Sequence, residues 1–145
     1  MPVLTSKQRE DLLPNAKVSY GMAVLNKETH ETTISTRRFN KPLLDFPEEF
    51  KLMLIKNMFR LQVERLDFTY AVDTFEGKIY EVLALAHPRD PFCYKVGRQI
   101  VLGRLLRLEG RLSRGKSKDP KKLSLTRDSY DLEKIDWALI SEVEE

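Results

Sequence analysis

The feature that most constrains the fold is a hairpin pattern in the middle of the chain. Leu66, Phe68, Tyr70 and Val72 follow one another at every second position, which is the period of a half-buried strand. Residues 73–77 then supply a turn that ends in glycine, and residues 78–86 form an apolar return strand. The pattern predicts an antiparallel hairpin, around which the other segments must pack.

The flanking segments predict four helices and further strands. A capping box at Thr5 and Gln8 opens a short helix that ends near Pro14, and a helix over residues 48–56 has Pro47 in its first turn. Strands are predicted at 17–25, at 32–39 and, from a second alternation, at 59–63; longer helices are predicted at 92–112 and 129–143. The expected class is α+β, an antiparallel sheet with helices segregated towards the C-terminus.

The length of 145 residues fits a single domain spanning 1–145. There is no run of about 18 apolar residues, so we expect no membrane partner. The first residues do not resemble a signal peptide. The lone Cys93 cannot form an intramolecular disulfide. These features predict a cytoplasmic protein.

Charge is distributed unevenly along the chain. Residues 128–145 carry seven acids and one lysine, a net charge of −6, whereas the other residues carry 24 basic and 15 acidic groups, a net charge of +9. A mobile basic linker is predicted near 113–122, ahead of the acidic helix. A basic body indicates a surface that attracts anions, although the tail could equally pair with the body of its own or a neighbouring chain.

The predicted helix 92–112 carries an apolar seam with a row of arginines beside it. The seam consists of Val101, Leu105, Leu108 and Leu112, and the row of Arg104, Arg107, Arg111 and Arg114. Three interpretations are open: a core-facing helix with a solvated edge, pairing with a second copy through the seam, or arginines that converge on phosphates or carboxylates.

The start of this helix combines cations with aromatic rings. Asp90 can cap a helix that has Pro91 at its first position, and helix N-termini favour anions. The nearby cations are Arg89, Lys95 and Arg98, and Phe92 and Tyr94 could stack on a base. The same residues would also occur at an ordinary helix start.

Catalysis is poorly supported by the sequence. His87 and Cys93 could form a thiol–imidazole pair, but no orienting third group has a recognisable signature. His30, His87 and Cys93 are too few for a structural zinc site, and no glycine-rich phosphate loop follows a strand. We expect no enzymatic activity, no metal and no cofactor.

The block of residues 70–107 resembles small phage and prophage proteins, in particular the first family of Thoeris anti-defence proteins. The resemblance rests on a hairpin followed by His87-Pro-x-Asp90-x-Phe92-x-x-Lys95-x-Gly97-Arg98 and Ile100-x-Leu102-Gly103-Arg104. It covers about 40 of the 145 residues. It implies a non-catalytic immune antagonist, a homodimer or higher homo-oligomer that sequesters a cyclic ADP-ribose isomer at interfaces between chains.

The resemblance also implies roles for individual residues. Arg98 and Arg104 would contact phosphates, and Asp90 would bind ribose hydroxyls or cap the backbone. Phe75, Tyr80 or Phe92 would stack on adenine. The full set of expected ligand-binding residues is His87, Arg89, Asp90, Phe92, Arg98, Arg104, Arg107, Phe75 and Tyr80.

Three other functions compete with sequestration. The basic body and the linker would suit a nucleic-acid backbone, although the acidic tail opposes it. A direct inhibitor of a host enzyme could act through the acidic C-terminal helix. A hydrolase of the same nucleotide is the third alternative.

Overall fold

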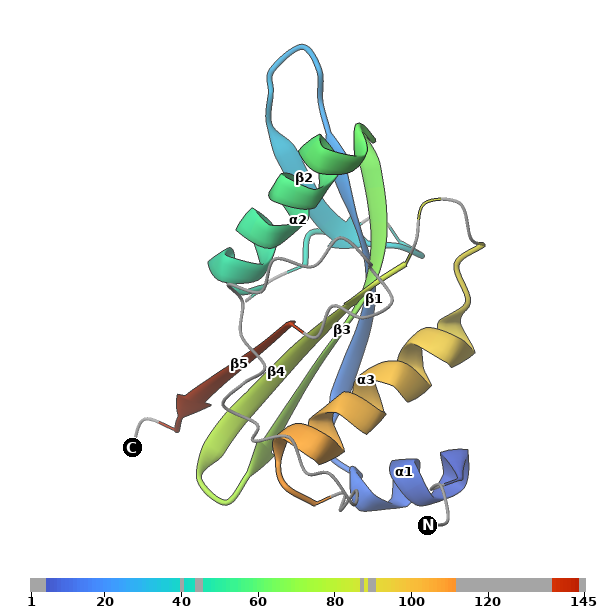
Figure 1. Cartoon of the computed structure of the whole chain (residues 1–145), viewed down its shortest axis with the longest axis vertical. Helices are drawn as coiled ribbons and strands as arrows, with labels where there is room; N and C mark the ends of the chain where they lie inside the picture. The colour runs from blue at the N-terminus through green and yellow to red at the C-terminus, as the bar shows by residue number, and fades with distance from the viewer. Residues whose placement is uncertain are drawn as a thin grey trace.

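In the residues that it describes, the computed structural model of the protein has a five-stranded antiparallel sheet and three helices (Figure 1). It describes residues 5–39, 41–43, 46–86, 88, 91–111 and 137–143. The strand order is β2-β1-β3-β4-β5. In chain order the elements are α1 (Ser6–Leu12), β1 (Lys17–Leu25), β2 (Thr32–Thr36), α2 (Glu48–Leu61), β3 (Arg65–Phe75), β4 (Lys78–Leu85), α3 (Tyr94–Leu108) and β5 (Trp137–Glu142).

The two faces of the sheet are covered by different helices. Successive side chains of a strand point to opposite faces, so Phe68 and Ala71 of β3 lie on opposite sides. Phe68 packs in one core cluster with residues of α2, and Ala71 in a second cluster with residues of α3. Helix α1 lies beside α3 (Figure 1). The chain is therefore a central sheet between α2 and the α1–α3 pair.

Several predicted elements are confirmed. The central hairpin forms as β3 and β4, with Tyr70 opposite Leu83. The strand predicted at 17–25 pairs as β1 with the first part of the strand predicted at 32–39, which ends as β2 at Thr36. The capping box of α1 is present, because Thr5 Oγ1 accepts from the Gln8 amide and Gln8 Oε1 accepts from the Thr5 amide. The α+β class is confirmed as well.

The helices are not all located towards the C-terminus, as the sequence had predicted. Helix α1 precedes the sheet, α2 lies between β2 and β3, and the last described element is a strand. The predicted helix over 129–143 is wrong at residues 137–142, which form β5 on the outer edge of β4. The backbone groups of β4 would otherwise lack partners on that edge, and pairing satisfies them. Residues 112–136, which include the predicted linker, lie outside the described residues.

The strand predicted at 59–63 is also wrong, because α2 continues to Leu61. Phe50, Leu54 and Met58 recur at intervals of four and are all buried, so the helical period determines the structure here. Gln62 ends the helix in the left-handed conformation, with φ of 56°, and the Val63 amide donates to the Met58 carbonyl.

The seam of the third helix packs against the chain's own sheet. Val101 and Leu105 are fully buried, and Leu108 is nearly so. For the described part of the seam, the core-facing helix of the first interpretation is therefore confirmed, but its solvated edge is wrong at the buried Arg104, and pairing of two copies through this seam is wrong. Helix α3 begins at Tyr94 and not at Phe92, and its N-cap Cys93 makes no capping hydrogen bond through its side chain.

Candidate anion-binding site

The structure does not gather the predicted ligand-binding residues into one site. Phe92 lies just before α3, whereas Phe75 and Tyr80 lie on the strands at the other end of that helix, and Tyr80 is buried there. His87, Arg89 and Asp90 lie outside the described residues. The arginines of α3 divide between the surface and the core.

Arg98 ties α1 to α3. Its Nε and Nη2 donate to the two carboxylate oxygens of Glu10 at 2.7 and 2.6 Å, and the side-chain Nε2 of Gln99 donates to the same carboxylate at 3.2 Å. Hydrogen bonding from Arg98 lowers the pKa of Glu10. A bidentate pair of this kind already satisfies the fork of the guanidinium. An anion at Arg98 would have to displace Glu10 and loosen α1.

Arg104 lies inside the molecule. Its side chain is only 6% exposed and donates to the Leu83 carbonyl at 3.1 Å, which joins α3 to β4. Arg107, one turn further along, is half-buried. The arginine row is therefore not a single solvent-facing stripe.

A different group of cationic and aromatic side chains meets at the start of α3. The arginine–aromatic cluster comprises Tyr20, Arg37, Phe92 and Tyr94. The Arg37 guanidinium lies 4.5 Å from the centre of the Phe92 ring, and its Nη1 donates to the Tyr94 hydroxyl at 3.1 Å. Tyr20 contacts both rings edge-on, at centroid distances of 6.3 and 4.7 Å. Cation–π contacts with Phe92 and Tyr94 hold the guanidinium beside these two rings.

Asp67 places a second arginine next to this cluster. Its Oδ1 accepts from Arg65 Nε and Nη2 at 3.3 and 3.1 Å, and Arg37 Nε lies 3.3 Å from the same oxygen. The contact with Arg37 lacks hydrogen-bond geometry, since that Nε has no hydrogen-bond partner among the described residues. One carboxylate thus faces two guanidinium groups, and the local charge is positive.

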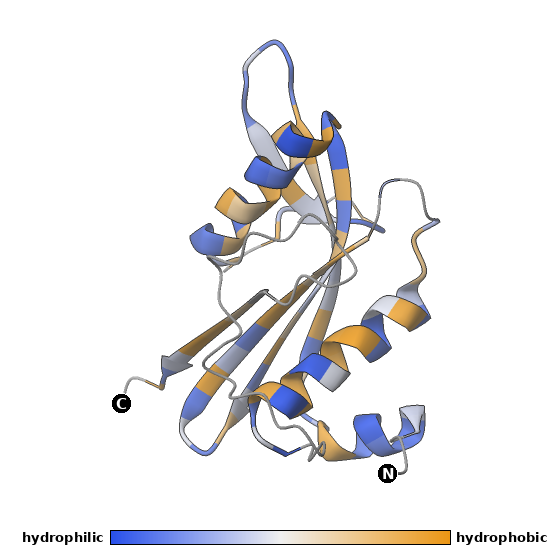
Figure 2. Cartoon of the chain, in the orientation of Figure 1, coloured by the Kyte–Doolittle hydropathy of each residue, from blue (hydrophilic) through white to orange (hydrophobic). Residues whose placement is uncertain are grey.

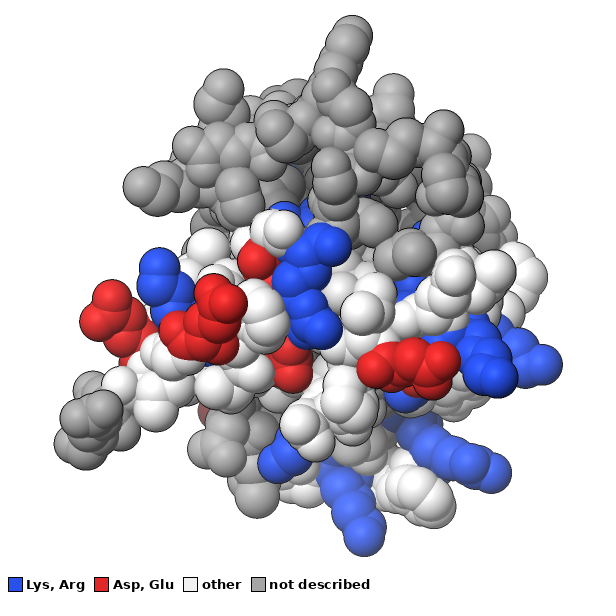
Figure 3. Space-filling model, turned by 90° about the horizontal axis from the view of Figure 1, so that it is seen from below, with Lys and Arg blue, Asp and Glu red and all other residues white. Residues whose placement is uncertain are grey.

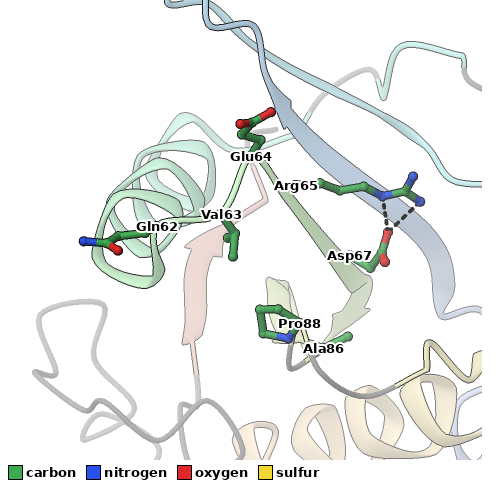
Figure 4. A pocket seen from close by; sticks show the side chains of 7 residues that line it. All are labelled: Gln62, Val63, Glu64, Arg65, Asp67, Ala86 and Pro88. Carbon is green, nitrogen blue, oxygen red and sulfur yellow. Dashed lines mark hydrogen bonds and ion pairs between the residues drawn. The ribbon is translucent and has the colours of Figure 1, made fainter.

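A hollow of about 410 Å³ opens beside Arg65 and Asp67 (Figure 4). The Ala86 amide donates to the Asp67 carbonyl, and β4 ends one residue earlier. The first residues of β3 therefore extend past the end of β4, and this leaves a notch beside them. The lining residues are Gln62, Val63, Glu64, Arg65, Asp67, Ala86 and Pro88. Glu64 in this lining pairs with Lys27 at 2.5 Å, so its charge is balanced.

Of this site, the sequence predicted only Phe92 and Tyr94. Tyr20, Arg37 and Arg65 were missed because they lie far from the helix start along the chain. A usable signal exists in the first hairpin, where Gly21 pairs with Thr36 and the Arg37 amide donates to the Tyr20 carbonyl. Side chains of directly opposite residues lie on one face, so this register brings Tyr20 and Arg37 together.

Other kinds of site are not evident in the described part of the chain. Within it there is no group of three or more His, Cys, Asp or Glu residues that could hold a metal ion. Nor does any helix there have the length and apolar character needed to cross a membrane.

A buried carboxyl pair lies at the far end of α3. The side chain of Glu109 is fully buried, and Arg111 Nη1 donates to its Oε1 at 3.0 Å. Burial, together with a hydrogen bond to the buried Asp73, raises the pKa of Glu109 to about 8, although Arg111 opposes the shift. The raised pKa favours a protonated Glu109 that donates to Asp73.

We expect this pair to make stability depend on pH. In the unfolded chain Glu109 loses its proton near pH 4.5, whereas in the fold it keeps the proton until about pH 8. The stabilisation is complete below the lower value and is lost as the pH rises to the upper one, by about 1.4 kcal/mol per pH unit. Denaturant unfolding of wild type and Glu109→Gln between pH 5 and 8 measures it. The glutamine variant should lack this decline, and parallel curves would refute the assignment.

Comparisons of the chain with protein-family models, with curated proteins and with solved structures found no significant match. The candidate site therefore rests on its own geometry: two guanidinium groups around one carboxylate, three aromatic rings and an open hollow.

Proposed function

We propose that this protein is a non-catalytic binding protein for a small anionic nucleotide. The observation that carries the proposal is the Arg37 guanidinium, which is stacked on Phe92 and shares Asp67 with Arg65. In the proposed complex the phosphates of the ligand take the place of the Asp67 carboxylate. The base packs against the exposed edges of the arginine–aromatic cluster.

The electrostatics favour replacement of the Asp67 carboxylate by the phosphates of the ligand. Asp67 supplies a single negative charge to two guanidiniums, whereas a pyrophosphate supplies two or more. The Arg37–Asp67 contact is an ion pair without hydrogen-bond geometry, so opening it costs Coulombic attraction, which a phosphate would restore, but no well-formed hydrogen bond. Charge-assisted hydrogen bonds to phosphate contribute about 1.5–3 kcal/mol each. The rings already fix Arg37, which reduces the entropy lost on binding.

The resemblance of residues 70–107 suggests which nucleotide is bound. It favours a cyclic ADP-ribose isomer, held without turnover, so that the signal no longer reaches a defence effector of the host. In this proposal the protein is an anti-defence antagonist of phage or prophage origin. The site is in the chain itself, at the start of α3, and differs from the arginine row expected from the sequence.

The alternative of a nucleic-acid backbone receives less support. On the face seen from below, basic and acidic side chains are interspersed among the described residues (Figure 3). A protein that binds the backbone of a nucleic-acid duplex needs a continuous basic surface that contacts many phosphates. The arginine–aromatic cluster and the neighbouring Arg65 instead combine two cations with three rings in a confined area.

Thermal unfolding against a panel of nucleotides tests the proposal. At a hundred times its dissociation constant, a ligand stabilises the fold by about 2.7 kcal/mol. We expect that stabilisation with a cyclic ADP-ribose isomer, and we expect the compound to be recovered intact after heating. Product that accumulates with time would indicate a hydrolase. No stabilisation by any nucleotide in the panel would overturn the proposal.

A further inference from the structure

Helix α2 is apolar on two opposite sides. Phe50, Leu54 and Met58 are buried against the sheet, as expected for the inner side of a surface helix. On the outer side Leu52 is 57% exposed and Phe59 is 67% exposed. In Figure 2 the ribbon of α2 alternates between hydrophobic and hydrophilic segments.

The exposed residues form one strip along the helix axis. Leu52 and Phe59 are seven positions apart, which is about two turns, and the partly exposed Ile55 lies between them. We call Leu52, Ile55 and Phe59 the outer strip. Large apolar side chains that are aligned and exposed in this way are typical of an interaction surface. The spacing of three and four residues suits packing against another helix.

Charged residues are placed asymmetrically at the two ends of the outer strip. Glu48 and Glu49 lie in the first turn of α2, and Arg60 lies in the last turn. Two copies of α2 in parallel would place like charges side by side. In an antiparallel arrangement, the acids of one copy lie near Arg60 of the partner subunit, and the two helix dipoles also oppose each other.

We propose that the outer strip of α2 pairs with the same strip of a second copy, antiparallel, about a two-fold axis near Ile55 and Lys56. A two-fold interface requires a self-complementary surface. The strip meets this requirement, because Leu52 of one copy falls opposite Phe59 of the partner subunit when the axis lies midway. In this proposal α2 forms the dimer interface in place of the α3 seam, which is buried in the core of the same chain. The pairing does not depend on the proposed nucleotide.

Sedimentation velocity on three proteins tests the pairing. We expect the wild type to sediment as a dimer at tens of micromolar. Phe59→Glu should weaken the dimer at least tenfold and give a monomer at the same concentration. Phe39→Glu is the matched control, since Phe39 is 69% exposed but lies outside α2. A wild type that remains monomeric up to several hundred micromolar would overturn the proposal, as would a dimer insensitive to Phe59→Glu.

Cross-linking determines the orientation without relying on a disruptive substitution. In a Cys93→Ser background, Lys56→Cys places one thiol per chain near the proposed axis, and Glu48→Cys places it at the helix end. A short bis-maleimide should link Lys56→Cys chains into dimers and leave Glu48→Cys chains unlinked, because antiparallel helices hold their first turns about 20 Å apart. Efficient linking of the Glu48→Cys chains alone would contradict the antiparallel arrangement.

Discussion

Leu105→Glu should leave the chain unfolded. Leu105 is fully buried in the cluster that joins α3 to the sheet, alongside Val82 and Val101. The substitution removes a large apolar side chain and buries a carboxylate without a partner, which together cost more than about 5 kcal/mol. That is of the order of the whole stability of a domain of this size. Circular dichroism and denaturant unfolding would measure the loss.

A matched variant on the same helix separates burial from charge. Ile100 lies on α3 and is 41% exposed, so Ile100→Glu should fold with stability within about 1 kcal/mol of wild type. If Leu105→Glu instead gave a folded monomer, the seam would face a partner and the packing of α3 on the sheet described above would be wrong.

Gly97→Ala and Gly103→Ala should have opposite effects, although both replace a glycine inside α3. A Cβ at Gly97 would lie 2.2 Å from Thr69 Oγ1, and Thr69 is 1% exposed, so the Thr69 side chain or the helix must shift. At Gly103 the nearest atom would be 3.7 Å away, on Arg9. We expect Gly97→Ala to lose about 3 kcal/mol through overpacking and Gly103→Ala to gain up to about 1 kcal/mol through helix propensity.

A double substitution identifies the contact responsible. Thr69→Ala removes the hydroxyl that the new methyl group would meet, so the Gly97→Ala, Thr69→Ala pair should recover most of the loss. Denaturant midpoints at constant m-value would report each change in free energy. Equal effects of the two glycine substitutions would show that α3 does not approach β3 as closely as the structure has it.

The elements that the sequence predicted well are those with local signals. The β3–β4 hairpin combines a two-residue period with a turn in which Glu76 and Gly77 both have positive φ, of 51° and 78°. Helix α1 has its capping box in the sequence. By contrast, β5 forms because the edge of β4 is available. Its partners lie about 60 residues away, which no local pattern reveals.

The candidate site was only partly predictable for the same reason. Phe92 could be identified because it adjoins a predicted helix start. Arg98 and Arg104 were correctly placed on a helix, but their partners depend on how α1 and β4 pack against it. Arg37 and Arg65 join the site through strand register, which brings together residues far apart in the sequence. Tertiary packing, and not residue type, decides which arginines remain available to a ligand.

Calorimetric titration of a cyclic ADP-ribose isomer into three proteins tests the binding site most directly. Arg37→Met removes the guanidinium that stacks on Phe92, and the neighbouring Arg38→Met removes the same charge from an exposed side chain outside the arginine–aromatic cluster. We expect wild type and Arg38→Met to bind alike and Arg37→Met to bind at least tenfold more weakly, with all three equally folded. Equal affinity of Arg37→Met and wild type would contradict the site, and no binding by the wild type would contradict the proposed function.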